Sequence, residues 1–232
     1  MKKISKLDID ESVHIKNSLS SYYFEKCKFS HVRIGSSLKR LEDKLNFSDI
    51  TISDCKVVDA SIDAVDFKNI QIHNLSTKKN IDICNALFEN CTLRGKIGSI
   101  LIIDSANYSG TNPQFDLEVL NYNNSAYSKM DWALDISNAD FTLFDCRSIP
   151  AEKIIINKHS QIAVNLKRMK ALTKFPNDDI KLLWEVCTKT INRDFTGYNY
   201  ILTTSQRTKR HEEELRYFEF IRENGCELKR CE

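Results

Sequence analysis

The sequence predicts a mainly β solenoid followed by a small α/β, mostly helical C-terminal cap. Apolar residues recur every five positions between Leu45 and Leu75, and the chain changes to helical spacing after Ile149. The apolar residues form two series, offset by two positions. One contains Phe47, Ile52, Val57, Ile62, Phe67 and Ile72, and the other contains Leu45, Ile50, Cys55, Ala60, Val65, Ile70 and Leu75.

A five-residue period fits neither a straight helix nor a straight strand. Five residues of α-helix turn through about 500°, so successive members of a series would scatter around the helix. In a straight strand a step of five residues changes the face each time. The pattern is satisfied if the chain turns a corner once per five residues and points two side chains inward from each side. This describes a solenoid of β-like coils around an apolar axis.

Polar residues recur at the position expected for the corners. Asp and Asn tolerate turn and left-handed backbone conformations, and their side chains hydrogen-bond to nearby backbone groups. The alternative is that these residues are simply exposed, but their phase is kept over most of the run, which favours corners. The expected corner residues are Asp49, Asp54, Asp59, Ala64, Asn69 and Asn74.

Two further segments connect the repeat to a known family. Residues 138–142 read NADFT and residues 85–89 read NALFE. With these segments, residues 7–149 resemble a degenerate pentapeptide-repeat protein. The family folds as a right-handed, four-sided β-helix with about twenty residues per coil. The resemblance implies that Phe47 stacks near Phe67, and Phe67 near Phe88 after a one-residue insertion. It also implies that Asn side chains lie beside Asp side chains, in the pairs Asp49–Asn69 and Asp54–Asn74.

The repeat divides the chain into two expected domains. Residues 1–149 form the β-helix, with a short helical excursion near 36–45 where Leu residues take helical spacing. Residues 150–232 form the helical C-terminal capping region. The remaining inward pairs are expected at Tyr22/Phe24, Cys27/Phe29, Val32/Ile34, Ile81/Ile83, Ala86/Phe88, Cys91/Leu93, Leu101/Ile103, Ala106/Tyr108, Phe115/Leu117, Leu120/Tyr122, Leu134/Ile136, Ala139/Phe141 and Phe144/Cys146.

The C-terminal region has the pattern of a small helical unit. Helices are expected near 165–173, 177–193 and 208–224, and a short strand at 198–203. The open end of a solenoid exposes its core, so a terminal cap is required. Trp184 and Phe218 are expected to fix this cap to the last coil. The segments 131–137 and 147–154 also resemble uncharacterised bacterial proteins with similar repeats, a resemblance that bears on architecture only.

Charge and cysteine usage limit the functional classes. The 232 residues carry a formal charge of +2. Residues 1–150 hold 18 Lys and Arg against 20 Asp and Glu, and residues 151–232 hold 16 against 12. Neither half has the excess expected of a nucleic-acid binder. The absence of an apolar leader or membrane-length run favours a cytoplasmic location. Four cysteines at inward positions are expected to be unreactive structural thiols, namely Cys27, Cys55, Cys91 and Cys146.

No motif of catalysis or of cofactor or metal binding stands out. There is no GxSxG, Walker or GxGxxG sequence and no Cys/His ligand spacing. We therefore expect no enzyme, no cofactor and no metal. The one local charge signal is Arg207, Lys209 and Arg210, an anion or partner contact whose alternative is a solvated face paired with residues 212–214.

Three functional hypotheses follow. The first is a non-enzymatic scaffold that binds a protein partner through the solenoid wall and the cap. The second, implied by the family resemblance, is a DNA mimic that regulates a type II topoisomerase, which requires a strongly acidic face. The third is weak nucleic-acid binding through the C-terminal region. The charge balance favours the first. The partner's identity, the pathway and whether the chain forms a homo-oligomer stay open.

Overall fold

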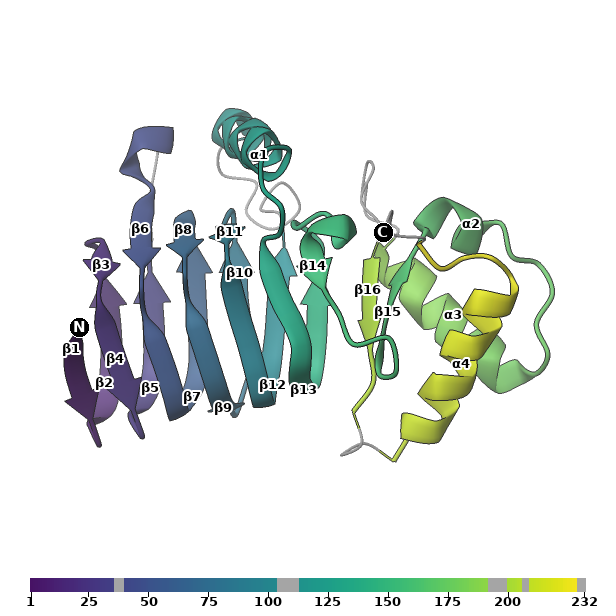
Figure 1. Ribbon diagram of the computed structural model, residues 1–232, viewed down its shortest axis with the longest axis horizontal. Helices are drawn as coiled ribbons and strands as arrows, with labels where there is room; N and C mark the ends of the chain where they lie inside the picture. The colour runs from purple at the N-terminus through teal and green to yellow at the C-terminus, as the bar shows by residue number, and fades with distance from the viewer. Residues whose placement is uncertain (36–39, 104–112, 192–199, 206–208, 229–232) are drawn as a thin grey trace.

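The computed structural model describes residues 1–35, 40–103, 113–191, 200–205 and 209–228. Within them the protein is mainly β, with two parallel sheets of ten and four strands and one antiparallel pair. The parallel strands are β1 (Lys2–Ser5), β2 (Asp8–Ile15), β3 (Leu19–Ser20), β4 (Tyr22–Glu25), β5 (Lys28–Ile34), β6 (Leu45–Ser48), β7 (Thr51–Asp63), β8 (Val65–Lys68), β9 (Gln71–Thr77), β10 (Ile81–Cys84), β11 (Leu87–Glu89), β12 (Cys91–Ile103), β13 (Leu134–Cys146) and β14 (Ile154–Ile155). We call this part the strand stack (Figure 1).

Strands in the stack pair in parallel with strands about one twenty-residue repeat away. Thr51 of β7 lies opposite Gln71 of β9, and Phe47 of β6 lies opposite Phe67 of β8. The next step is one residue longer, because Phe67 pairs with Phe88 of β11. The ring centroids of Phe47 and Phe67 are 5.9 Å apart, and those of Phe67 and Phe88 are 5.1 Å apart. The predicted stacking of all three rings, including the insertion, is confirmed.

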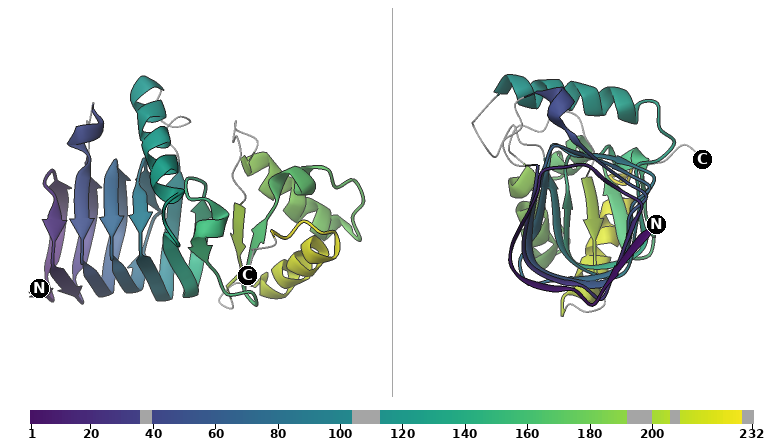
Figure 2. Two further views of the ribbon diagram at one scale, coloured as in Figure 1. Left: turned by 45° about the horizontal axis from the view of Figure 1, so that its top comes forward. Right: turned by 90° about the vertical axis from the view of Figure 1, so that its left-hand side faces the viewer.

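The interior of the stack contains both predicted apolar series. All their members belong to one hydrophobic core, either buried or packed against it. Viewed along the stack, the chain traces a roughly four-sided outline with these residues inside it (Figure 2). The five-residue period therefore predicted correctly which two side chains of each side point inward.

The corner prediction holds at five of its six positions. Asp49, Asp54, Asn69 and Asn74 have φ between 53° and 55°, and Ala64 has φ 52°. Asp59 was wrongly expected to be a corner, since it lacks the positive φ that the other five positions share.

The helical excursion takes the form of a single 3₁₀ turn. The turn, η1, spans Leu41–Asp43, and β6 begins at Leu45. Residues 36–39 of the predicted excursion lie outside the described residues. The excursion explains why Leu19 of β3 pairs with Phe47, 28 residues later.

One segment predicted as a coil is a helix. Helix α1 spans Pro113–Tyr127, which contradicts the inward pairs expected at Phe115/Leu117 and Leu120/Tyr122. Its buried positions are instead Val119, Asn123 and Tyr127, spaced four residues apart as in a helix. The side chains of Leu117 and Tyr122 are exposed.

The phase of β12 also differs from the prediction. Leu101 and Ile103 were expected inward, but Ile100 and Ile102 lie opposite Ile81 and Ile83 of the core. The register with β9 shifts between Arg94 and Ile97, at Gly95, whose φ is +72°. β12 then goes from Ile97, opposite Leu75, to Ile100, opposite Ile81, in three residues where the preceding layer uses six, and this shorter path brings Ile100 and Ile102 inward one position early. The pair expected at Ala106/Tyr108 lies outside the described residues.

The C-terminal unit contains the predicted helices and strand. After the 3₁₀ turn η3 (Ala151–Lys153), strand β15 (Gln161–Val164) pairs antiparallel with β16 (Tyr200–Thr203). The helices are α2 (Leu166–Lys170), α3 (Asp178–Ile191) and α4 (His211–Glu223). Asn177 caps α3, since its Oδ1 accepts a hydrogen bond from Ile180 N at 2.8 Å.

Contact between this unit and the stack runs through β15 and β16. Ala163 and Ile201 belong to the core of the stack, and Gln161 Nε2 donates to the carbonyl oxygen of Ile136 at 2.9 Å. Trp184 and Phe218 do not join the unit to the stack, contrary to expectation. They pack in a second hydrophobic cluster within the C-terminal unit, because α3 and α4 lie on the side of β15 and β16 away from the stack (Figure 1).

Candidate functional site

The basic cluster predicted from the sequence lies at the start of α4. Lys209 and Arg210 are exposed, whereas Arg207 lies outside the described residues. Glu212, Glu213 and Glu214 form the acidic first turn of the helix. These carboxylates offset the unfavourable placement of cations at a helix N-terminus.

The outer wall of the stack carries charges of both signs in pairs between neighbouring layers. Lys3 Nζ lies 3.0 Å from Glu25 Oε2, Lys28 Nζ lies 3.1 Å from Asp8 Oδ1, and Lys68 Nζ lies 2.6 Å from Glu89 Oε1. Exposed pairs of this kind contribute little to stability. These pairs of opposite charges interrupt any continuous surface of one sign. DNA mimicry requires a continuous negative surface.

The densest charged group on the wall surrounds Asp59 of β7, and we call it the Asp59 cluster. His31 Nδ1 and Arg33 Nη1 lie 2.8 and 3.0 Å from Asp59 Oδ1, and Lys79 Nζ lies 3.7 Å from Oδ2. The hydrogen bond with His31, supported by Arg33, holds the pKa of the Asp59 carboxyl below its usual value. Asp82 of β10 completes the cluster, and burial raises its pKa.

Asp82 is the least satisfied member of the Asp59 cluster. Its Oδ1 is buried and accepts no hydrogen bond from any described residue. The positive charge of Arg33 lowers the pKa of Asp82, but burial raises this pKa by more. A buried carboxylate oxygen without a donor is unfavourable. A donor on a partner would reach Asp82 at its other oxygen, Oδ2, which is not one of the buried unpaired atoms.

A second polar group joins α1 to the stack. Lys44 Nζ lies 2.5 Å from Asp66 Oδ1, 3.2 Å from Asn123 Oδ1 and 4.7 Å from the centroid of the Tyr122 ring. The Tyr122 hydroxyl donates to Asp66 Oδ2 at 2.8 Å. Burial lowers the pKa of Lys44, and burial together with Asp66 raises the pKa of Tyr122 to about 12. The Lys44 side chain is only 4% exposed, so we assign this group to docking α1 rather than to chemistry on a ligand.

Neither polar group could be predicted from the spacing of residues in the sequence. His31 and Asp59 are 28 residues apart, because the excursion at 36–45 lengthens that layer. Lys44 and Asn123 are 79 residues apart. The pairing of such residues depends on the register of the stack and on a helix that the repeat pattern concealed.

The four repeat-phase thiols occupy the predicted interior positions. Cys27, Cys55, Cys91 and Cys146 are buried and reduced. Burial raises the pKa of Cys55 and raises that of Cys91 to about 12. Within the described part of the chain, no group of three or more His, Cys, Asp or Glu side chains is arranged to hold a metal ion. No helix among these residues is long and apolar enough to cross a membrane.

Comparison with protein-family models, with curated proteins and with solved structures finds no match for this chain.

Proposed function

We propose that the protein is a non-enzymatic scaffold that binds a protein partner through the wall of its strand stack. The Asp59 cluster is the observation that carries this proposal. It holds three cationic or titratable side chains around one carboxylate, beside the buried Asp82 oxygen that lacks a donor. A partner that supplies a donor to Asp82 and a carboxylate to Lys79 would complement the cluster.

The architecture supports a scaffold role. We infer a right-handed β-helix of the pentapeptide-repeat type, because layers recur at about twenty residues, turn at left-handed Asp and Asn corners and enclose an apolar axis. Parallel strands in a continuous stack give a stiff wall, so a partner meets a preformed surface. The reduced, buried thiols fit a cytoplasmic protein.

We further infer that residues 150–232 cap this β-helix. Ala163, Ile201 and the buried Gln161 cover its last layers, while Lys209 and Arg210 stay at the surface. The cap would add a second, variable surface beside the wall. Reversing the charge of Arg207, Lys209 and Arg210 together should leave the fold intact and test whether this surface contributes to binding.

The test compares the partners of wall variants. The immobilised wild-type protein, the variants Lys79→Glu and Asp82→Asn, and the control Lys68→Glu are exposed to a lysate of the native host, and bound proteins are identified by mass spectrometry. Lys79 is 69% exposed and Lys68 is 53% exposed, so neither charge reversal should disturb folding. Direct titration of the purified partner then gives its affinity for each variant.

A partner retained by wild type and Lys68→Glu, but weakened by Lys79→Glu and Asp82→Asn, supports the proposal. Equal retention by all four proteins would exclude the Asp59 cluster as the binding face. Failure of the wild type to retain any protein above the bare matrix would count against a protein partner altogether. Capture of a type II topoisomerase, with inhibition of its activity, would favour DNA mimicry instead.

A further inference from the structure

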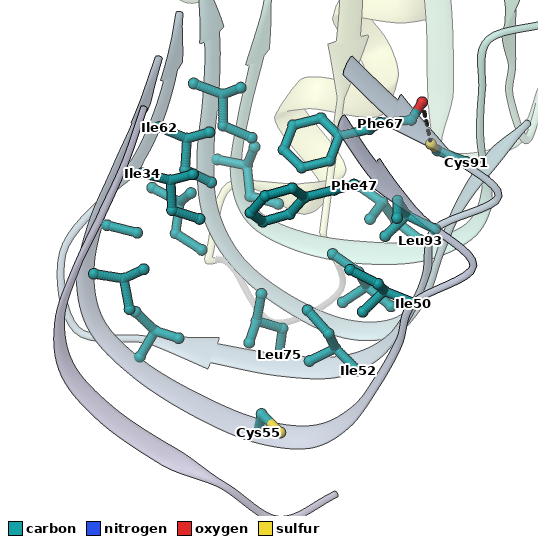
Figure 3. Close-up of a pocket in the computed structure, with 18 of the residues that line it drawn as sticks. Ile34, Phe47, Ile50, Ile52, Cys55, Ile62, Phe67, Leu75, Cys91 and Leu93 are labelled. Atoms are coloured by element: carbon teal, nitrogen blue, oxygen red, sulfur yellow. Dashed lines mark hydrogen bonds between the residues drawn. The ribbon is translucent and has the colours of Figure 1, made fainter. Parts of the chain in front are cut away.

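An apolar cavity of about 290 Å³ lies inside the strand stack (Figure 3). Every side chain that lines it is apolar or a cysteine thiol, and no polar surface faces it. Ile52, Ile62 and Ile72 point inward yet keep accessible surface, because the space between opposite walls is not filled. Cavities of this character do not hold water well, and smaller ones bind apolar molecules.

The cavity is long and narrow. Its lining begins at Val13 and Ile15 of β2 and continues to Ile102 of β12 and Leu134 of β13. These residues belong to the first and the last layers of the stack, and layers of strands lie about 4.8 Å apart, so the lining spans on the order of 25 Å. A volume of 290 Å³ spread over such a length has room for one extended alkyl chain.

The described residues close only the C-terminal end of the cavity. At the C-terminal end Ile100, Ile102 and Leu134 are at most 3% exposed, and Ala163 and Ile201 of the C-terminal unit extend the same core. At the N-terminal end β1, β2 and β3 each pair with a strand on one side only, within the described residues. The lining residues near that end, Val13, Ile15, Leu19 and Phe24, are all partly exposed. As formed by the described residues, the cavity is therefore a channel that is closed at the C-terminal end and open at β1–β3.

An exposed lysine, Lys2, lies in β1 beside this end of the stack. In β1, Lys2 lies opposite Tyr22 and Ile4 lies opposite Phe24, and both aromatic rings pack against the core. Because strand side chains alternate, Lys2 lies on the same face of β1 as Ile4, which also packs against the core. Lys2 Nζ lies 5.8 Å from the centroid of the Tyr22 ring.

The adjacent Lys3 differs from Lys2 in its contacts. Lys3 points to the outer face and pairs with Glu25 at 3.0 Å. Lys2 makes no ion pair with any described residue. A cation at the head of an otherwise apolar column is complementary to a molecule with an apolar tail and an anionic end.

We propose that the channel binds a single-chain anionic amphiphile, with its acyl tail along the apolar interior and its charged end at Lys2. This site is separate from the Asp59 cluster, which lies on the outer wall. A free fatty acid and a lysophospholipid share the required chemistry. The channel would thus give the protein a second, small-molecule ligand besides its protein partner.

The test measures binding of dodecanoate by isothermal titration below its micelle concentration. The proposal expects saturable binding with one site per chain. Dodecyltrimethylammonium has the same tail and the opposite charge, so it should bind more weakly, by up to about fivefold, which is the upper end for an exposed ion pair. Dodecanoyl lysophosphatidylglycerol, titrated in parallel, distinguishes the two sources, and the tighter ligand identifies the natural head group.

Two sets of variants locate the site. Ile62→Phe and Ile72→Phe should each fill the channel and abolish binding without lowering the melting temperature, since they add apolar volume to an unfilled space. Ser61→Phe, at the exposed neighbouring position of β7, should bind like wild type. Lys2→Gln should weaken dodecanoate to the level of the cationic amphiphile, whereas Lys3→Gln should not.

Three results would overturn the proposal. The first is the absence of saturable binding of every amphiphile to wild type. The second is undiminished binding to folded Ile62→Phe and Ile72→Phe, which would place the ligand elsewhere. The third is equal affinity for the anionic and cationic amphiphiles, which would remove the role of Lys2.

Discussion

Asn69 Nδ2 donates a hydrogen bond to Asp49 Oδ1 at 2.9 Å, across two adjacent layers of the stack. Asn74 and Asp54 repeat this contact at 2.9 Å. All four residues have left-handed backbone conformations at the corners of the layers. Each Asn amide donates a hydrogen bond to an oxygen of the neighbouring Asp carboxylate, and it adds no second negative charge beside it.

Replacing Asn74 with Asp should destabilise the protein at neutral pH. The hydrogen bond from Asn74 is the main reason that the pKa of Asp54 lies below its usual value. A carboxyl group whose pKa is lowered by folding stabilises the folded protein at pH values above about 3.9, its pKa in the unfolded chain. This stabilisation is lost as the pH falls through the lower pKa of the folded protein. The melting temperature of Asn74→Asp should therefore fall below wild type at pH 7, with the difference disappearing near pH 3.

Asn90→Asp is the matched control for this change. Asn90 has φ 54°, like Asn74, but its neighbour in the preceding layer is Asn69 rather than an acidic residue. It should melt close to wild type at both pH values. Equal loss in the two variants would mean that the Asp54–Asn74 contact has no special role.

Phe67→Ala should be strongly destabilising. The Phe67 ring contacts Phe47 on one side and Phe88 on the other, with centroid distances of 5.9 and 5.1 Å. Removing it deletes both contacts and enlarges the cavity, at a cost of roughly 3–5 kcal/mol in the free energy of unfolding. Urea denaturation measures this loss, and Phe67→Leu, which keeps most of the volume, should lose clearly less. A loss below about 1 kcal/mol for Phe67→Ala would contradict the stacked arrangement.

The buried thiols should resist modification until the protein unfolds. Burial raises the pKa of Cys91 to about 12, so almost none of it is thiolate at pH 8. A raised thiol pKa also makes the free energy of unfolding fall once the pH exceeds about 8.5, the thiol pKa in the unfolded chain. Above that pH the unfolded chain loses its thiol proton while the folded chain keeps it. Labelling with a thiol reagent at pH 8, followed by peptide mass spectrometry, should find Cys27, Cys55, Cys91 and Cys146 unmodified. Rapid native labelling at these positions would refute their placement.

Lys44 and Asp66 should show strong energetic coupling. Lys44→Met would leave the Asp66 carboxylate half-buried without its cation, at a cost of roughly 3 kcal/mol. Asp66→Asn in the Lys44→Met background should restore part of this loss, because no unpaired charge remains. A double-mutant cycle by urea denaturation gives the coupling energy, and additive effects would argue against the pair.

The inward positions and most of the corners could be predicted from the sequence because both depend on local pattern. A two-in-five period fixes which side chains face inward, and Asp or Asn tolerates the left-handed corner wherever a corner falls. Asp59 shows the limit of this reasoning. It has the right residue type and phase, but its backbone lacks the left-handed φ of a corner, and its carboxylate pairs with His31 and Arg33.

Helix α1 was mispredicted because its sequence supports two patterns. Phe115, Leu117, Leu120 and Tyr122 fit repeat pairs, yet Pro113 at the start of a helix and the spacing of Val119 and Tyr127 fit a helix. The Lys44–Asp66 pair and the Asp59 cluster could not be found from sequence spacing. Both depend on segments that leave the five-residue period, and the position at which the chain re-enters the stack after such a segment cannot be read from the repeat. The unfilled channel is likewise a property of packing between opposite walls, which a count of apolar residues does not reveal.

The core, the corners and the channel all depend on the register between layers, that is, on which residues of adjacent strands lie opposite each other. A cysteine cross-link tests this register directly. Thr51 lies opposite Gln71 in adjacent parallel strands, and strands about 4.8 Å apart are within reach of a disulfide. Under mild oxidation, Thr51→Cys with Gln71→Cys should form a cross-link that peptide mass spectrometry identifies. Thr51→Cys with His73→Cys, displaced by two residues along the same face, should not. Preferential cross-linking at position 73, or none at either position, would contradict the twenty-residue register.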